Sequence, residues 1–69
     1  MQIILSILLY LNVISSPGTY TVTQIQADVD ANTSSVSAIQ NNTSLLTYVV
    51  ATYKKQVSGI NILDDGQLR

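Results

Sequence analysis

The chain has no cysteine and no histidine, and it has no glutamate because its four acidic residues are all aspartates. Without cysteine no disulfide can form, and without cysteine or histidine the usual zinc sites have no ligands. A chain of 69 residues obtains only about 3–5 kcal/mol from its own core. Association with other chains is therefore the remaining route to a stable fold.

Charge is also scarce, with three basic and four acidic residues and a net charge of −1. Binding to a nucleic-acid backbone requires a basic surface, and attraction to an anionic membrane surface requires a polybasic segment. The sequence has neither, so we expect no nucleic-acid partner. Before Asp28 the only ionisable side chains are tyrosines, which marks the first third as a different kind of segment.

Groups for catalysis are missing as well. The only carboxylate pairs are Asp28 with Asp30 and Asp64 with Asp65. The first pair suits the positive end of a helix dipole and the second suits a turn. With no glycine-rich phosphate loop and no nucleophile motif, we expect no enzyme and no catalytic, cofactor-binding or metal-binding residues.

Residues 1–14 are almost wholly apolar, interrupted by Gln2, Ser6 and Asn12. As a helix they rise about 21 Å, short of the roughly 30 Å hydrocarbon core of a bilayer, so we expect no membrane span. The alternatives are a β-strand buried on both faces, a short buried helix, and a signal peptide, although a signal peptide usually has a basic start. The strand is favoured because aliphatic residues occupy every odd position. These residues are the predicted docking element, which needs cover from other chains: Ile3, Leu5, Ile7, Leu9, Leu11 and Val13.

Residues 16–19 combine Pro17 and Gly18 in the order of a type II turn, in which the glycine has positive φ. Residues 19–23 alternate β-forming side chains. We expect a short second strand or an extended connector there.

A seven-residue repeat then covers most of the chain. Its positions recur at alternating steps of three and four, which places them in one stripe along a helix. We expect a helix over residues 24–58, about 52 Å long at 1.5 Å per residue. Thr23 and Gln26 have the form of a capping box, and Gly59 is placed to end the helix in a left-handed conformation. The repeat consists of Val22, Ile25, Val29, Asn32, Val36, Ile39, Thr43, Leu46, Val50, Tyr53, Val57 and Ile60.

Helix propensity is poor over residues 31–37, which are rich in Ser, Thr and Asn. The alternative to a packed helix here is a polar linker. The first core position of every heptad is β-branched and isoleucine recurs at the second, a composition that favours three parallel strands over two. The predicted fold is mainly α: a parallel trimeric coiled coil with short β segments at both ends.

The segment Val29-Asp30-Ala31-Asn32-Thr33 resembles the aliphatic-x-x-Asn-Thr heptad in the stalks of trimeric autotransporter adhesins and trimeric phage fibres. The resemblance implies that Asn32 points toward the trimer axis and holds an anion such as chloride, with Thr33 as support. Without an ion, a buried asparagine layer would set register and oligomer state. Asn42 would repeat this layer if the register slips by three, and the core after the slip would be Leu46, Val49, Tyr53 and Ile60.

After Gly59, residues 60–63 have the pattern of a strand, and residues 64–69 that of an Asp-Gly turn with the start of a return strand. The predicted organisation is a docking strand and turn (1–18), a connector or short strand (19–23), the coiled-coil helix (24–58), and a β-turn cap or the start of a distal β region (59–69).

These features predict a structural component of a virion fibre or related extracellular appendage. It would be a homotrimeric stalk docked by its apolar N-terminus into a carrier protein of the larger assembly. The alternative is a small secreted or membrane-associated protein that binds a host partner through an amphipathic helix.

Overall fold

The computed structural model describes residues 2–63, which form helices α1 (Gln2–Tyr10), α2 (Val22–Ala31), α3 (Thr33–Gln40) and α4 (Thr43–Ser58). The strands are β1 (Gly18–Thr21) and β2 (Ile60–Leu63). The protein is therefore mainly helical with short β segments, as the sequence predicts.

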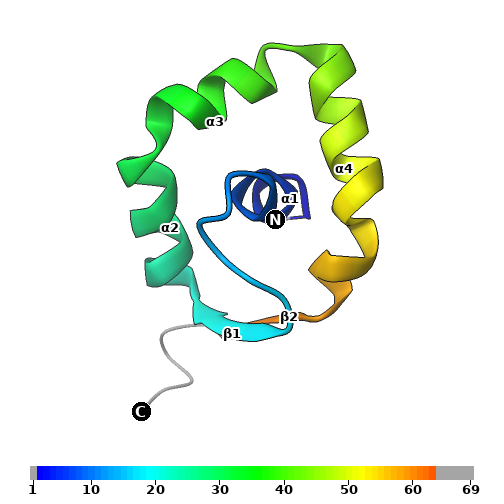
Figure 1. The fold of residues 1–69 in the computed structure, drawn as a ribbon. Helices are drawn as coiled ribbons and strands as arrows, with labels where there is room; N and C mark the ends of the chain where they lie inside the picture. Colours follow the sequence, from blue (N-terminus) through cyan, green and yellow to red (C-terminus); the bar gives the residue numbers. More distant parts are fainter. Residues whose placement is uncertain (1, 64–69) are drawn as a thin grey trace.

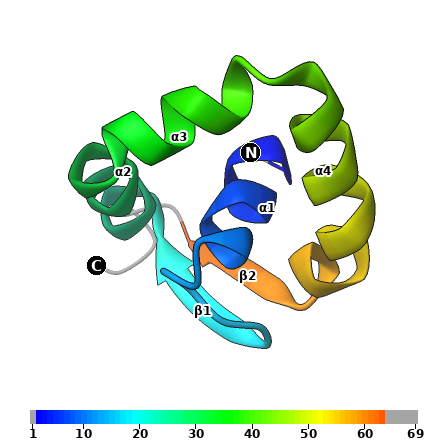
Figure 2. The same cartoon turned by 45° about the horizontal axis from the view of Figure 1, so that its top comes forward.

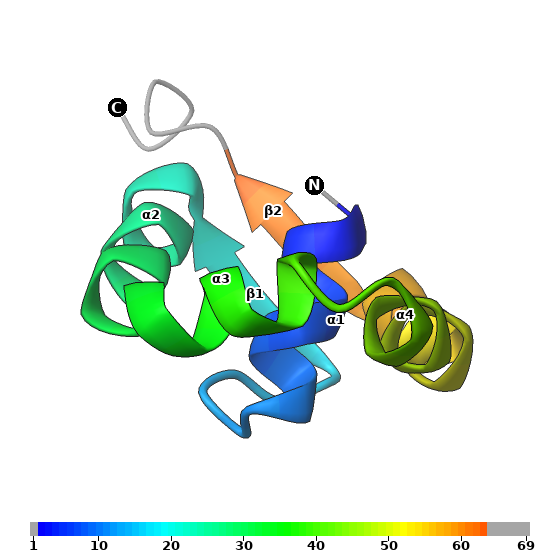
Figure 3. The same ribbon diagram turned by 90° about the horizontal axis from the view of Figure 1, so that it is seen from above.

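Helix α1 lies at the centre of the molecule (Figure 1). Helices α2, α3 and α4 follow one another in an arc around it, and the two strands close the remaining side. Figure 2 and Figure 3 show the same arrangement from other directions, with α2 and α4 on opposite sides of α1. The first helix is thus surrounded by the rest of the chain.

Because residues 2–10 are helical, the predicted strand over residues 3–13 is wrong, and the short buried helix is the alternative that the structure shows. An almost uninterrupted apolar segment has apolar residues at both the strand and the helix period, so its pattern does not distinguish them. A helix satisfies its own backbone groups, whereas a strand needs a neighbouring strand. The fully buried hydroxyl of Ser6 also finds its partner within the helix, because it donates to the Gln2 carbonyl oxygen at 2.9 Å.

Helix α1 ends at Tyr10 and is followed by a turn in which Asn12 has a positive φ of 64°. The Asn12 N–H donates to the Leu9 carbonyl at 3.0 Å, and the Val13 N–H donates to the Leu8 carbonyl at 3.0 Å. These two bonds are those of a Schellman motif, in which asparagine is the usual substitute for glycine. The chain can therefore reverse direction at Asn12 and leave the centre of the fold.

The continuous helix predicted over residues 24–58 is also wrong, because the chain bends at Asn32 and again at residues 41–42. Asn32 leaves helical geometry with φ −125° and ψ 29°. Asn42 is extended, and its side chain accepts a hydrogen bond from the Leu45 N–H at 3.2 Å. Asparagine favours caps over helix interiors, so the chain bends at Asn32, within the segment of poor propensity, and at Asn42, beyond it.

The bends turn the heptad stripe inward around α1. The buried core consists of two clusters that both include α1 side chains: Leu5, Leu8, Leu9, Ile14 and Ile25 in one, and Ile7, Val36, Ile39 and Val49 in the other. Half-buried stripe residues pack against these clusters: Val29, Leu46, Tyr53, Val57 and Ile60. Within the protomer, α1 is therefore the partner of the stripe.

The predicted caps shift in position. The capping box forms at Thr21 and Gln24, with the Gln24 N–H donating to Thr21 Oγ1 at 3.1 Å and the Thr21 N–H donating to Gln24 Oε1 at 2.8 Å. The box predicted at Thr23 and Gln26 is wrong by two residues. Gly59 ends α4 with φ −85°, so its predicted left-handed conformation is wrong as well.

Strands β1 and β2 pair in parallel, from Gly18 with Ile60 to Thr21 with Leu63. The short strand predicted as one alternative within residues 19–23, and the strand at residues 60–63, are confirmed. Parallel strands need a long crossover, which here consists of α2, α3 and α4. The predicted Asp-Gly turn and return strand lie outside the described residues.

The turn before β1 is not the predicted type II turn. Gly18 does not have positive φ, and the Ser16–Pro17 peptide bond is cis. The Ser15 N–H donates to the Tyr20 hydroxyl at 3.0 Å across this turn.

Between residues 2 and 63, no helix has both the length and the apolar character needed to cross a bilayer.

Candidate functional site

The predicted docking residues contribute mainly to the core of their own chain. Leu5 is 4% exposed, Ile7 is 0% exposed and Leu9 is 6% exposed. Leu11 and Val13 are half-buried, whereas Ile3 is 47% exposed. The expectation that other chains must cover this segment is therefore wrong for all but its first residues, because α1 is covered by the helices that follow it.

The predicted trimer-core residues divide between the inside and the outside of the protomer. Ile25, Val36 and Ile39 are buried. Val22 is 42% exposed and Thr43 is also exposed; each is the first residue of its helix. These two residues have no core role within one protomer.

Asn32, the candidate anion ligand, lies at the junction of α2 and α3. Its Nδ2 donates to the Asp28 carbonyl oxygen at 2.8 Å. Thr33 Oγ1 donates to the Asp30 carbonyl oxygen at 2.9 Å. Both side-chain donors are thus used to join the end of α2 to the start of α3.

A polar hollow of about 250 Å³ adjoins this junction and is lined by residues 30–35. Its backbone N–H groups at the start of α3 favour an anion. The carboxylate of Asp30, which also lines the hollow, opposes one. Chloride at Asn32 stays a prediction for the trimer.

Among residues 2–63 the carboxylates do not gather into a site. Asp28 and Asp30 both lie on α2. Within residues 2–63 no group of three or more potential metal-binding side chains occurs. Asp64 and Asp65 lie outside the described part of the chain.

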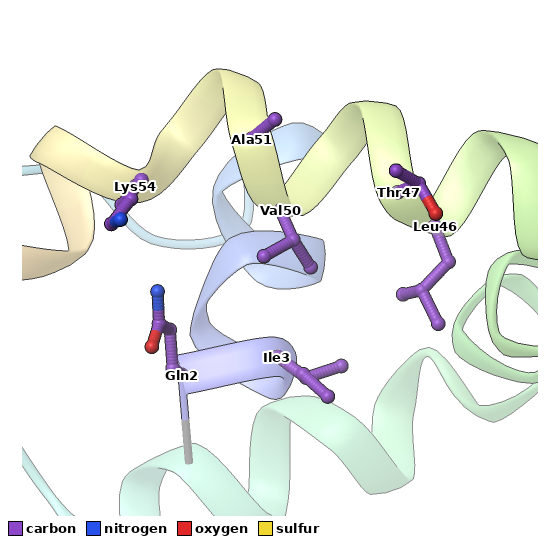
Figure 4. A pocket seen from close by; sticks show the side chains of 7 residues that line it. All are labelled: Gln2, Ile3, Leu46, Thr47, Val50, Ala51 and Lys54. Atoms are coloured by element: carbon purple, nitrogen blue, oxygen red, sulfur yellow. The ribbon is translucent and has the colours of Figure 1, made fainter.

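An apolar groove of about 540 Å³ lies between the start of α1 and the outer side of α4. Figure 4 shows Lys54 and Gln2 at one end, Leu46 and Thr47 at the other, and Ile3 and Val50 on facing walls between them. We call this hollow the α1–α4 groove. Its lining residues are Gln2, Ile3, Leu46, Thr47, Val50, Ala51 and Lys54.

The sequence contains a signal for this groove in the adjacent valines at positions 49 and 50. A single helical stripe can bury only one of two neighbours. Val49 is 0% exposed in the core, and Val50 lines the groove. The slipped register, which places Val49 inward, describes α4 better than the unslipped one.

The surface around α4 carries one more large side chain, since Tyr48 is 59% exposed. The aliphatic groove with its exposed Ile3 is a surface suited to noncovalent association. No family model, curated protein or solved structure matches the chain.

Proposed function

We propose that this chain is a structural subunit that works by associating with copies of itself, as a homotrimer in a virion fibre or related appendage. The observation that supports this most directly is the α1–α4 groove, whose walls include Ile3, Leu46 and Val50. Aliphatic side chains left on the surface of so small a domain favour burial against another chain. The proposed activity is assembly rather than catalysis.

The form of the trimer follows from how the heptad stripe is used. A parallel coiled coil would bury the stripe between chains, and it would require α1 to leave the centre of each protomer. That separation would expose Ile7 and Leu8, both 0% exposed in the protomer. At about 25 cal/mol per Å² of apolar surface, this exposure opposes the opening. We therefore favour a trimer of protomers that keep α1 in place, with the coiled coil as the alternative form.

Because α1 is largely buried in its own protomer, few of the predicted docking residues are free to contact a carrier protein. Of the predicted docking residues, Ile3 is the one that is both aliphatic and exposed. Because Ile3 lines the α1–α4 groove, its exposure supports attachment to the carrier beside the proposed contact between subunits.

Sedimentation equilibrium of the intact chain tests the proposal. We expect a mass of three chains at micromolar concentration. A mass of one chain throughout the accessible range would exclude the structural assembly, and a mass of two would refute the trimer. Circular dichroism across the same range separates the two forms of trimer, because joining α2, α3 and α4 into one helix raises the helical signal on assembly.

A second candidate function is that of a secreted or membrane-associated protein that binds a host partner through α4. The exposure of Tyr48 on α4 favours it, since tyrosine is enriched in protein interfaces. A stably helical monomer would support this candidate over the assembly.

A further inference from the structure

The outer side of α2 carries a short ridge of exposed side chains that do not pack against the core. Val22 is 42% exposed, and Gln26 and Asp30 are exposed too. These residues are spaced four apart, so they form one of the inclined rows seen on helix surfaces. The ridge is apolar at its N-terminal end and acidic at its C-terminal end.

The acidic end of this ridge is held in place. Gln26 Nε2 donates to Asp30 Oδ1 at 2.9 Å. A carboxylate has two oxygens and about four acceptor sites, so Asp30 keeps the capacity to accept from a cation. The α2 ridge therefore presents an ordered negative charge at one end.

A second row with the same spacing lies in the wall of the α1–α4 groove and consists of Leu46, Val50 and Lys54. It is apolar at its N-terminal end and basic at its C-terminal end. Figure 4 shows Lys54 beside Gln2 at that end, with the aliphatic wall beyond them. Each row covers eight residue steps, about 12 Å at 1.5 Å per residue.

The two rows are complementary in length and in charge, and each has an aliphatic side chain at its N-terminal end. With the helices running in the same direction, Val22 lies against Leu46 and Asp30 lies against Lys54. Both rows follow the four-residue spacing, and helices that interlock such rows cross at about −50°, the commonest class of helix packing. The opposite charges then meet at the same end.

One protomer cannot make this contact with itself, because α2 and α4 lie on opposite sides of α1 (Figure 1). The contact therefore has to be made between copies. It joins two different surfaces, so it is a heterologous contact, which generates a ring when the rotation closes. In a ring of three copies, every α1–α4 groove would be occupied by the α2 ridge of a neighbouring copy.

We propose that α2 of one copy occupies the α1–α4 groove of the next copy, with Asp30 of the first paired to Lys54 of the second. This inference rests on the proposed self-association and assigns the surface that carries it. The occupant is a second copy of this chain. A groove that binds only a helix of another protein or an apolar small molecule would leave the isolated chain monomeric in the test below.

Charge reversal in the intact chain provides the test. Sedimentation equilibrium measures the association constant of the unaltered protein, Asp30→Lys, Lys54→Asp and the double variant. Each single reversal turns an attraction into a repulsion, and we expect it to raise Kd by about tenfold, which corresponds to about 1.4 kcal/mol. The double variant restores the opposite charges in exchanged positions, and its Kd should return to within about threefold of the original, about 0.65 kcal/mol.

Lys55→Asp is the matched control. Lys55 is the neighbour of Lys54 on α4 and lies outside the groove lining. This variant changes the net charge by the same amount as Lys54→Asp, and we expect Kd to stay within about twofold, about 0.4 kcal/mol. Circular dichroism and thermal melts of all variants establish that each protomer keeps its fold.

The outcomes separate the interface from the trimer. A trimer whose Kd is unchanged by the single reversals, or not restored by the double variant, overturns the ridge-in-groove contact and leaves the structural assembly standing. Rescue in an assembly of another size supports the contact and excludes the trimer. A chain that is monomeric at every concentration excludes both, including the case in which the groove binds only a foreign helix or a small molecule.

Discussion

The ring of Tyr10 meets the ring of Tyr53 edge to face, with centroids 6.3 Å apart and an angle of 78° between the ring planes. Tyr10 is the last residue of α1, and Tyr53 lies in the C-terminal half of α4. The contact joins the central helix to the helix beside it. Aromatic pairs in this geometry stabilise proteins by about 0.5–1.5 kcal/mol beyond the effect of their burial.

A double-mutant cycle measures this contact. We expect the loss of stability in Tyr10→Leu plus that in Tyr53→Leu to exceed the loss in the double variant by about 0.5–1.5 kcal/mol, because the second substitution finds the pair already broken. Urea unfolding followed by circular dichroism gives the values. Tyr48→Leu, on the outer face of α4, should change stability by less than about 0.5 kcal/mol. Additive effects of the pair would contradict the contact.

The position of α1 inside its own chain predicts a contrast between Leu8 and Ile3. Leu8 is 0% exposed and Ile3 is 47% exposed. Leu8→Ala should destabilise the protomer by about 2–5 kcal/mol through the cavity it leaves, whereas Ile3→Ala should cost less than about 0.5 kcal/mol of folding stability. Thermal unfolding at a concentration where the protein is monomeric measures both. Equal and small effects would mean that α1 is covered by another chain.

Gly59 and Ser16 are predicted to be coupled. A Cβ added to Gly59 would lie 2.6 Å from Ser16 Oγ, which donates to the Gln56 carbonyl oxygen at 2.7 Å. Gly59→Ala should displace this hydroxyl and cost about 0.5–1.5 kcal/mol, the usual contribution of one hydrogen bond. In the Ser16→Ala background the same substitution meets no hydroxyl, and its cost should be smaller. Chemical denaturation of the four proteins measures the difference, and an equal cost in both backgrounds would contradict the coupling.

Asn32→Ile distinguishes the two forms of trimer. In the protomer described here it removes the hydrogen bond from Nδ2 to the Asp28 carbonyl oxygen, so we expect the melting temperature to fall with a loss of about 0.5–1.5 kcal/mol. In a coiled coil the same change replaces a polar core layer by an apolar one and should raise the melting temperature. Differential scanning calorimetry gives the sign. A rise would favour the coiled coil.

The anion prediction has its own test. Crystals of the trimer soaked in bromide should show anomalous density at the Asn32 layer if the asparagines hold an anion on the three-fold axis. Asn32→Ala should remove that density without moving neighbouring atoms. Density that is absent from the unaltered protein, or that sits at another position, would leave Asn32 with its observed role of joining α2 to α3.

Much of the inward face of the fold follows from sequence alone. The heptad stripe includes Ile25, Val36 and Ile39, which are buried, because the helix period is a local property that apolar spacing reports directly. The strand at residues 60–63 follows from local β-forming composition. For residues 19–23 the composition leaves a short strand and an extended connector open, and the strand that forms is residues 18–21. Poor helix propensity over residues 31–37 indicates the bend at Asn32, and the possible register slip of three marks the bend at Asn42, but the sustained heptad favours a continuous helix through both.

The sequence by itself determined which residues prefer burial, and only the tertiary structure decided what covers them. A stripe of aliphatic side chains can be buried equally well against another chain or against a helix of its own chain, because the hydrophobic effect is non-directional. The sequence favours a strand where helix α1 forms, because nearly all of its residues are apolar and fit both periods. The place of α1 in the centre depends on contacts far along the chain. The α1–α4 groove exists for the same reason, because once Val49 faces α1, Val50 has to face outward.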